Sequence, residues 1–397
     1  MFVCRPVQRL IVNTLSKQIE CISNPFRSES KLNAESNSQA YHFHKTLPGY
    51  KPTPLVSLKN LSNQLGIQEI LVKDESQRLG LNAFKVLGAS YAMALEIQRM
   101  LGSNNTPLTY ETIKKEHQAI KKMTFVTATD GNHGRAVAWS AKHFGCKAVV
   151  YMPEGSSDFR LQVIQQLHAD AEITDVNYDD TVKYAESQAL INNWILLQDS
   201  SWPGYVDVAK HIMMGYTTMV EEFIDQTSDW PTHVIAQAGV GSFAASMFAC
   251  FSQTNNVKPK LILLEPTGAA CFFNSIKVGD QQPHLTQELN TIMAGLSCGL
   301  PSVLAWDIIT QVTDIFAVCD DELAFQGMRL FANPNQGDPL IISGESGAVP
   351  LGFIHEICTN EAYTPMKNLL EIDSSSTVLM FSTEGDTDPE LYAKILR

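Results

Sequence analysis

The stretch TFVTATDGNHGRAVAWSAKHFG, residues 124–145, decides the fold class. Its first part, Thr124–Ala128, is a short apolar run of the kind that forms a buried strand, and a polar turn follows it. From Asn132 to Phe144 apolar residues recur at helical spacing, and Gly145 then supplies a helix stop. A short apolar strand followed at once by an amphipathic helix is the unit from which helix-covered parallel sheets are built. The stretch therefore predicts an α/β protein.

Runs of the same two kinds occur on both sides of this stretch. Short apolar runs, each expected to form a strand, lie at Glu69–Lys73, Ala148–Met152, Ala171–Thr174, Ile195–Gln198, His233–Ala236, Leu261–Leu264 and Val378–Ser382. Longer amphipathic runs, each expected to form a helix, lie at Lys85–Met100, Phe159–Leu167, Asp180–Asn192, Ile212–Asp225, Ser242–Phe251, Glu322–Phe331 and Glu390–Leu396. The 397 residues suffice for two domains of ordinary size. Residues 1–45 are polar and irregular, so we expect them to form a loosely packed arm.

Charge and hydropathy exclude two classes of partner. The net charge is −13, and an acidic chain repels both phosphate backbones and anionic lipid surfaces. Nucleic acid and membrane are therefore not expected partners. The apolar stretch Val234–Phe251 contains Gln237 and several small residues, so it is interpreted as a strand, a loop and a helix rather than a membrane span.

The eight cysteines indicate the compartment. They are scattered, without a CxxC pair or a Cys/His cluster at zinc spacing, so no metal site is expected and a reducing compartment is favoured. A pairing of Cys271 with Cys298 stays open. We expect a cytoplasmic protein. The alternative, a mitochondrial presequence, rests on Arg5, Arg9 and Lys17, which stand without an acidic residue in the first 19 positions.

A lysine opens one of the expected helices, in the run Asn82-Ala83-Phe84-Lys85. The helix that follows is largely apolar, and lysine is seldom buried without a partner. Lys85 is therefore a candidate for an amine that binds a carbonyl-bearing cofactor, since desolvation can lower the pKa of such an amine. The alternative is a surface lysine in a first helical turn, which this run by itself favours.

A glycine-rich loop, Ala238-Gly239-Val240-Gly241-Ser242, joins an expected strand to an expected helix. Glycines let the backbone approach an anion closely, and the helix start adds the positive end of its dipole, so the loop predicts a phosphate cup. It lacks the Gly-Lys-Ser/Thr ending of a nucleotide-binding loop and the third glycine of a dinucleotide fingerprint. A plain tight turn is the alternative.

Three further segments carry polar groups near expected strand ends or helix starts. They are Thr129–Arg135, which contains Asp130 and Asn132, Ser343–Ala348, which contains Glu345, and Ser382–Asp388, which contains Thr383. The carboxyl ends of strands are where α/β proteins place ligands. For Asp130 a structural role as a helix N-cap is the alternative. For Ser343–Ala348 it is a helix N-cap with a capping glycine, and for the last segment it is a solvated turn.

Taken in order, these motifs resemble those of one family. The runs NAFK, TDGNHGR, QAGVG, SGESGA and STEGDTD are similar to those of fold type II pyridoxal 5′-phosphate (PLP) enzymes, the tryptophan synthase β-like group, and more closely to those of the diaminopropionate ammonia-lyases. The resemblance extends from about residue 45 to the C-terminus. It implies two doubly wound parallel-sheet domains with the active site in the cleft. Residues 46–86 and 231–397 would form the large PLP-binding domain, and residues 87–230 the smaller inserted domain.

The resemblance also implies a role for each matching residue and a homodimeric assembly. Lys85 would hold PLP as a Schiff base, and Asn132 would hydrogen-bond the ring hydroxyl. Gly239, Val240, Gly241 and Ser242 would cradle the phosphate, and Glu345 would lie with the small residues beside the ring. Ser382 or Thr383 would face the pyridine nitrogen, with Thr383 favoured.

Asp130 narrows the expected substrate. Related dehydratases commonly have Ser or Thr there, whereas an aspartate attracts an ammonium group and can act as a base on the face opposite Lys85. Asp199 is a candidate second carboxylate for the substrate's β-amino group. We therefore expect a carbon–nitrogen lyase that converts D- and L-2,3-diaminopropionate into pyruvate and two ammonia. The alternatives are a serine/threonine dehydratase or threonine synthase-like lyase, and a non-catalytic metabolite-binding α/β protein.

Overall fold

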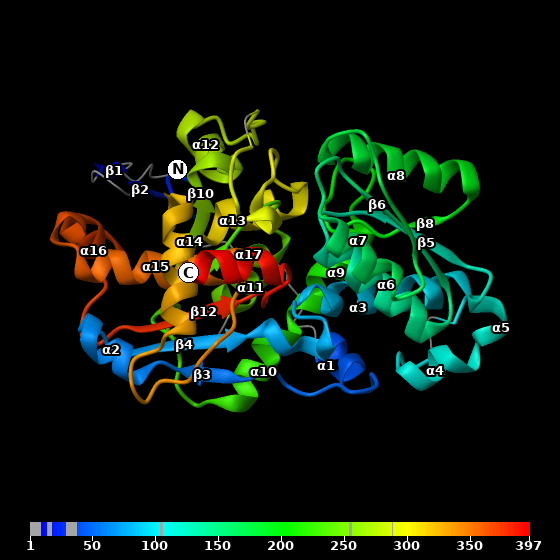
Figure 1. Cartoon of the computed structure of the whole chain (residues 1–397), viewed down its shortest axis with the longest axis horizontal. Coiled ribbons are helices and arrows are strands. Elements are labelled where there is room, and N and C mark those ends of the chain that lie inside the picture. The colour runs from blue at the N-terminus through cyan, green and yellow to red at the C-terminus, as the bar shows by residue number, and fades with distance from the viewer. Residues whose placement is uncertain (1–8, 14–17, 29–37, 104–105, 254–255, 288) are drawn as a thin grey trace. The chain divides into compact units, whose positions relative to one another are not determined.

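Two β-sheets organise the chain (Figure 1). The computed structural model describes residues 9–13, 18–28, 38–103, 106–253, 256–287 and 289–397. The chain divides into two compact units. The first unit comprises residues 1–36, 53–76 and 222–397, and the second comprises residues 37–52 and 77–221. Lys85 therefore falls in the second unit, although we expected it at the edge of the large domain.

The first unit contains an eight-stranded sheet with the order β1-β2-β11-β10-β9-β12-β4-β3. Its strands are β1 (Arg9–Asn13), β2 (Gln18–Ser23), β3 (Leu55–Ser57), β4 (Glu69–Asp74), β9 (His233–Gln237), β10 (Lys260–Pro266), β11 (Ile315–Cys319) and β12 (Thr377–Ser382). The five strands from β11 to β4 are parallel, and antiparallel strands are added at both edges. The carboxyl ends of β9 and β12, which lead into the glycine loop and Thr383, lie side by side in this arrangement.

Helices cover this sheet and seal its core. They are α2 (Lys59–Leu65), α11 (Ser242–Ser252), α12 (Cys271–Val278), α13 (Val303–Val312), α14 (Asp321–Ala332), α15 (Glu345–Thr359), α16 (Thr364–Leu370) and α17 (Pro389–Leu396). Alternate strand residues such as Ile262 and Leu264 pack in one buried cluster with side chains of α14 and α15. These two helices touch through Gly327 and Gly352, because a Cβ at Gly352 would overlap the carbonyl oxygen of Leu323.

The second unit contains a four-stranded parallel sheet with the order β7-β6-β5-β8. Its strands are β5 (Thr124–Ala128), β6 (Lys147–Met152), β7 (Asp170–Ile173) and β8 (Ile195–Leu196). Its helices are α1 (Ser38–His44), α3 (Lys85–Met100), α4 (Tyr110–Lys115), α5 (His117–Ile120), α6 (Asn132–Phe144), α7 (Asp158–Gln165), α8 (Tyr178–Asn192), α9 (Asp207–Tyr216) and α10 (Thr218–Gln226), which the boundary between the units divides.

Both faces of the smaller sheet are covered (Figure 1). Val149 packs with Ala185 of α8, whereas its neighbour Val150 packs with Ala138 of α6 and Ile164 of α7. Because successive strand residues point to opposite faces, α8 lies on one side and α6 and α7 on the other. The α/β fold predicted from the alternation of strands and helices is thus confirmed.

Two expectations about secondary structure are wrong. The expected helix Ile212–Asp225 is two helices, α9 and α10, which meet at Thr217. The Thr217 hydroxyl donates to Met214 O at 2.7 Å, and such a side-chain bond competes with the helical backbone pattern. In addition, the expected strand Ile195–Gln198 ends at Leu196, since the backbone N–H of Gln198 donates to the Tyr205 hydroxyl instead.

The expected loose arm at residues 1–45 is also wrong where the structure describes it. Strand β2 pairs antiparallel with β11, and its Ile19 and Cys21 are fully buried. The free energy gained by burying these alternate side chains offsets the conformational entropy lost when this short segment becomes ordered. Residues 1–8, 14–17 and 29–37 of the expected arm lie outside the described residues.

None of the helices in the described residues is both long and apolar enough to cross a membrane. The apolar stretch Val234–Phe251 forms most of β9, a loop and most of α11, so its interpretation as a strand, a loop and a helix is confirmed. Nor do three or more His, Cys, Asp or Glu side chains gather as metal ligands anywhere in the described ranges. Cys271 and Cys298 are both thiols.

Candidate active site

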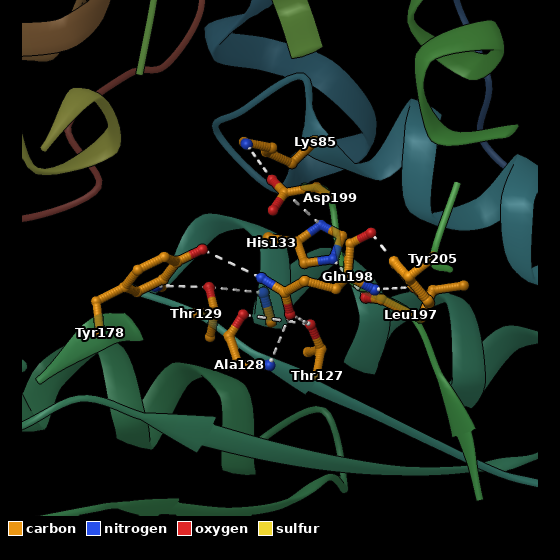
Figure 2. Close-up of polar contacts among 12 residues, drawn as sticks. Lys85, Thr127, Ala128, Thr129, His133, Tyr178, Leu197, Gln198, Asp199 and Tyr205 are labelled. Carbon is orange, nitrogen blue, oxygen red and sulfur yellow. Dashed lines mark hydrogen bonds and ion pairs between the residues drawn. The ribbon is translucent and has the colours of Figure 1, made fainter. Parts of the chain in front are cut away.

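Lys85 begins α3, and its ammonium forms an ion pair with Asp199, which follows β8 (Figure 2). The Lys85 side chain is 20% exposed and that of Asp199 is 6% exposed. Burial by itself lowers the pKa of Lys85, but the Asp199 carboxylate outweighs it and the pKa is raised. Burial likewise opposes ionisation of Asp199, yet Lys85 and then His133 hold its pKa at about 2. The pair is therefore an ammonium beside a carboxylate.

His133 lies on the other side of the same carboxylate (Figure 2). Its Nε2 is 2.7 Å from the carbonyl oxygen of Leu197, which only accepts, so Nε2 carries the proton. Its Nδ1 is 3.9 Å from Asp199 Oδ2. Burial lowers the pKa of His133 although Asp199 opposes the shift, so the imidazole is neutral at physiological pH.

A polar network fixes the chain on which Asp199 stands (Figure 2). Gln198 Oε1 accepts from the backbone N–H of Ala128 at 3.0 Å, and Gln198 Nε2 donates to the Tyr178 hydroxyl at 3.1 Å. The backbone N–H of Gln198 donates to the Tyr205 hydroxyl at 2.7 Å. Asp199 is therefore placed by three elements of the second unit, namely β5, α8 and the loop after β8.

The start of α6 positions Asp130 and Asn132. Thr129 Oγ1 accepts from the backbone N–H of Gly131 at 2.9 Å and of Gly134 at 3.0 Å. The alternative that Asp130 caps this helix is therefore wrong, because the threonine hydroxyl already does so. Asp130 is half-buried, and its charge contributes to the raised pKa of Lys85, so the two groups lie within electrostatic range. Asn132 is the first residue of α6.

The glycine loop of the first unit connects β9 to α11. Gly241 has φ +91°, a left-handed conformation that side chains disfavour, and a Cβ there would overlap the Phe272 ring. A Cβ at Gly239 would lie 3.0 Å from Gly295 O. Gly241 occupies the N-cap position and has no side chain to satisfy the first N–H groups of α11. The start of α11 therefore presents backbone N–H groups that a phosphate can bind, with Ser242 as its first residue, whereas the Cβ positions of the two glycines face protein atoms.

The remaining two motifs pack against each other in the same unit. The backbone N–H of Gly344 donates to Glu384 O at 2.9 Å, and that of Ser346 donates to the Glu384 carboxylate at 3.2 Å. A Cβ at Gly347 would lie 2.9 Å from the backbone nitrogen of Thr383. Glu345, the first residue of α15, is buried beside them. The small residues of SGESGA are therefore needed for this contact.

The hydroxyls of Ser382 and Thr383 are engaged differently. Ser382 is fully buried and donates to Ser343 Oγ at 2.8 Å. Thr383 Oγ1 accepts from Gln237 Nε2 at 3.0 Å. Only the Thr383 hydroxyl therefore retains a proton for a ligand.

Comparison with known proteins decides the family. Residues 46–358 match the family model described as pyridoxal-phosphate dependent enzyme. A diaminopropionate ammonia-lyase of Salmonella typhimurium is 45% identical, covering 92% of this chain and 93% of its own. The crystal structure of the holo diaminopropionate ammonia lyase of Escherichia coli is 39% identical, with a TM-score of 0.90 and 98% of both chains covered. This chain belongs to the PLP-dependent enzymes, in the diaminopropionate ammonia-lyase family. The E. coli enzyme was also solved with an aminoacrylate-PLP azomethine reaction intermediate, at 38% identity and a TM-score of 0.88.

Membership of this family confirms three expectations, namely the fold type II architecture, PLP as cofactor and a carbon–nitrogen lyase. The described residues fit the cofactor. The second unit offers a lysine amine at the start of α3, and the first offers a glycine loop at the start of α11, where no side chain caps the first N–H groups. The alternative of a non-catalytic metabolite-binding protein is thereby wrong.

Several residues of the site were not expected from the sequence. His133 stands next to Asn132 in a motif that we used, and Gln237 directly precedes the glycine loop, so their positions were available as a signal. No role was predicted for Tyr178 or Gln198, because their contact joins segments that are 20 residues apart.

Proposed function

We propose that this chain eliminates ammonia from 2,3-diaminopropionate, releasing pyruvate and two ammonia, with Lys85 as the residue that holds PLP. The buried ion pair of Lys85 and Asp199 carries this proposal. Bound PLP supplies an electron sink for the negative charge that develops on Cα. The chain's own residues bind the substrate, exclude water and move protons.

Asp199 is suited to bind an ammonium group rather than to act as a base. With the Lys85 ammonium beside it, the pKa of Asp199 is about 2, so the carboxylate is ionised as long as a cation lies next to it. When the Lys85 nitrogen binds the cofactor, it would neutralise this buried carboxylate less fully than the free ammonium does. The β-ammonium of diaminopropionate has the same chemistry and replaces it, whereas the hydroxyl of serine does not.

Asp130 is the proposed base opposite Lys85. Thr129, not Asp130, accepts the hydrogen bonds at the start of α6, and the Asp130 carboxylate lies within electrostatic range of Lys85. A base on each face of the substrate allows Cα deprotonation of either enantiomer, with Lys85 taking the proton on one face and Asp130 on the other. This supports activity on both D- and L-diaminopropionate.

The first unit supplies the proposed contacts to the rest of the cofactor. The backbone of Gly239, Val240, Gly241 and Ser242 would bind the phosphate, and Glu345 would border the ring. Thr383 would meet the pyridine nitrogen, because Ser382 already donates to Ser343. Asn132 of the second unit would hydrogen-bond the ring hydroxyl. A homodimer in the cytoplasm is part of this proposal, and sedimentation analysis tests the assembly.

Product stoichiometry tests the reaction. With diaminopropionate we expect two ammonia per pyruvate, and Lys85→Ala should abolish both activity and the visible absorbance of bound PLP. Asp199→Asn should raise KM for diaminopropionate far more than for serine, whereas Asp130→Asn should impair one enantiomer more than the other. A higher kcat/KM for serine, with one ammonia per pyruvate, would instead establish the dehydratase alternative.

A further inference from the structure

Gln237 ends β9 directly before the glycine loop, and its side chain is buried within the first unit. Its Nε2 lies 3.2 Å from Phe381 O and 3.0 Å from Thr383 Oγ1. A carbonyl oxygen only accepts hydrogen bonds, so the nitrogen of the amide, not its oxygen, must face Phe381. The backbone of β12 therefore fixes the orientation of the Gln237 amide.

This orientation holds although it has a cost. Gln237 Oε1 is buried and has no hydrogen-bond partner among the residues that the structure describes. A buried amide oxygen without a partner is unfavourable. The two hydrogen bonds that Nε2 donates, to Phe381 O and Thr383 Oγ1, must therefore outweigh this cost. The second N–H of the amide is consequently donated to Thr383.

The direction of that bond determines what Thr383 can do. A hydroxyl has one proton, and Thr383 already accepts from Gln237. Among the described residues no group accepts the Thr383 proton in return, and the neighbouring Ser382 hydroxyl is engaged with Ser343. Thr383 is thus set to donate to a ligand that has an acceptor and no proton.

We infer that Gln237 is a positioning residue that keeps the cofactor's pyridine nitrogen unprotonated by turning the Thr383 hydroxyl proton toward it. The inference rests on the proposed function, in which Thr383 meets that nitrogen. A donor at this position favours the unprotonated ring, because a protonated nitrogen would need an acceptor. An unprotonated ring withdraws charge from Cα less strongly. The charge on Cα is then passed to the leaving β-amino group, and transamination of the cofactor is suppressed.

The test is the ¹⁵N resonance of the ring nitrogen in holoenzyme reconstituted with [¹⁵N-pyridine]PLP. The wild-type resonance should lie in the range of an unprotonated, hydrogen-bonded pyridine. Gln237→Met removes the donor and should shift the resonance part of the way toward pyridinium. Gln237→Glu places an acceptor beside Thr383, reverses its hydroxyl and should shift the resonance further. Gln253→Glu, at an exposed position after α11, is the matched control for added charge and should leave it unchanged.

A second readout follows the fate of the cofactor. In Gln237→Glu the fraction of turnovers that end in pyridoxamine phosphate should rise about tenfold, the effect of one hydrogen bond of ordinary net strength. If Gln237 had only a structural role, its substitution would lower the fraction of protein that holds PLP. In the molecules that do hold PLP, the ring-nitrogen resonance and the pyridoxamine phosphate fraction would be unchanged.

Two results would overturn the inference. One is a wild-type resonance already at the pyridinium position. The other is that both Gln237 variants, with PLP bound, keep the wild-type resonance. Failure of the proposed function looks different, because Lys85→Ala would then retain the visible absorbance of covalently bound PLP.

Discussion

The Asp199 carboxylate controls the reactivity of Lys85 in the protein without bound cofactor, and Asp199→Asn isolates this effect. An amine reacts as a nucleophile only when it has lost its proton, and the ion pair raises the pKa of Lys85. The amide of asparagine keeps the size of the side chain and removes its charge. Burial then acts with much weaker opposition and lowers the pKa of Lys85.

The expected magnitude follows from the geometry of the pair. Two unit charges in contact attract each other by about 4 kcal/mol at the effective dielectric constant of about 20 that suits protein sites. Since about 1.4 kcal/mol corresponds to a factor of ten, the neutral fraction of Lys85 should rise up to about 1,000-fold at a fixed pH near neutrality. Asp130 remains within range of Lys85 and reduces this figure. We therefore expect at least about a 100-fold faster reaction of Lys85.

Competitive acetylation measures this rate directly. The protein without PLP is treated briefly with acetic anhydride, and modification of the Lys85 peptide is quantified by mass spectrometry between pH 6 and 9. Asp180→Asn is the matched control, because the Asp180–Lys183 pair is solvent-exposed and its charges are screened. Lys183 should therefore respond far less than Lys85. An unchanged Lys85 rate in Asp199→Asn, with the protein folded, would refute the claim that this carboxylate sets the Lys85 pKa.

Three further outcomes follow from the structure. Gly352→Ala should lower the free energy of unfolding by about 3 kcal/mol, the upper part of the range for overpacking, because α14 and α15 must separate. Urea denaturation measures this change. Gly279→Ala is the control: its Cβ would enter open space, but its φ is +83°, so it should show only the smaller effect of backbone strain. Gly241→Ala should weaken PLP binding at least about tenfold in a fluorescence titration, while Gly155→Ala, also at positive φ but in open space, should not. Burial raises the pKa of Glu265 from its ordinary 4.5 to about 8. An acid with a raised folded-state pKa stabilises the fold fully below about 4.5, and this contribution is lost as the pH rises through about 8. The melting temperature of Glu265→Gln relative to wild type should therefore increase from pH 5 to pH 9, and a constant difference would contradict the raised pKa.

Local patterns in the sequence predicted those parts of the fold that local forces determine. The bounds of β5, α3 and α6 agree with expectation, because each combines a clear hydrophobic period with a start or stop signal. Strand β2 was missed because its partner β11 lies almost 300 residues further along the chain. Helix α15 was missed beyond its first turn because Gly347, Pro350 and Gly352 interrupt the helical signal, although tight packing against α14 requires those glycines.

The site shows the same division between local and long-range information. A lysine at a helix start and a glycine loop before a helix are local features, and both were identified. The partner of Lys85 is 114 residues away, and that of Gln237 is 146 residues away. Asp199 was therefore recognised only as a possible second carboxylate, and Gln237 was not recognised. Both contacts depend on which strand ends are adjacent, and that follows from sheet order, which hydrophobic periodicity does not encode.

The Lys85–Asp199 pair should couple the binding of the cofactor to the binding of the substrate. A buried carboxylate is stable only with a cation beside it, and in the protein without PLP that cation is Lys85. Once the Lys85 nitrogen is bound to the cofactor aldehyde it would carry fewer protons, so its compensation of the Asp199 charge would weaken. The resulting cost weakens cofactor binding until a substrate ammonium takes the place of Lys85. Diaminopropionate and PLP should therefore bind with positive coupling, and by linkage the substrate should strengthen PLP retention to the same degree as PLP strengthens substrate binding. Serine, which presents a hydroxyl to Asp199, should show little of this coupling. Comparing the effects of serine and diaminopropionate on PLP retention therefore separates specificity that arises at Asp199 from general closure of the site.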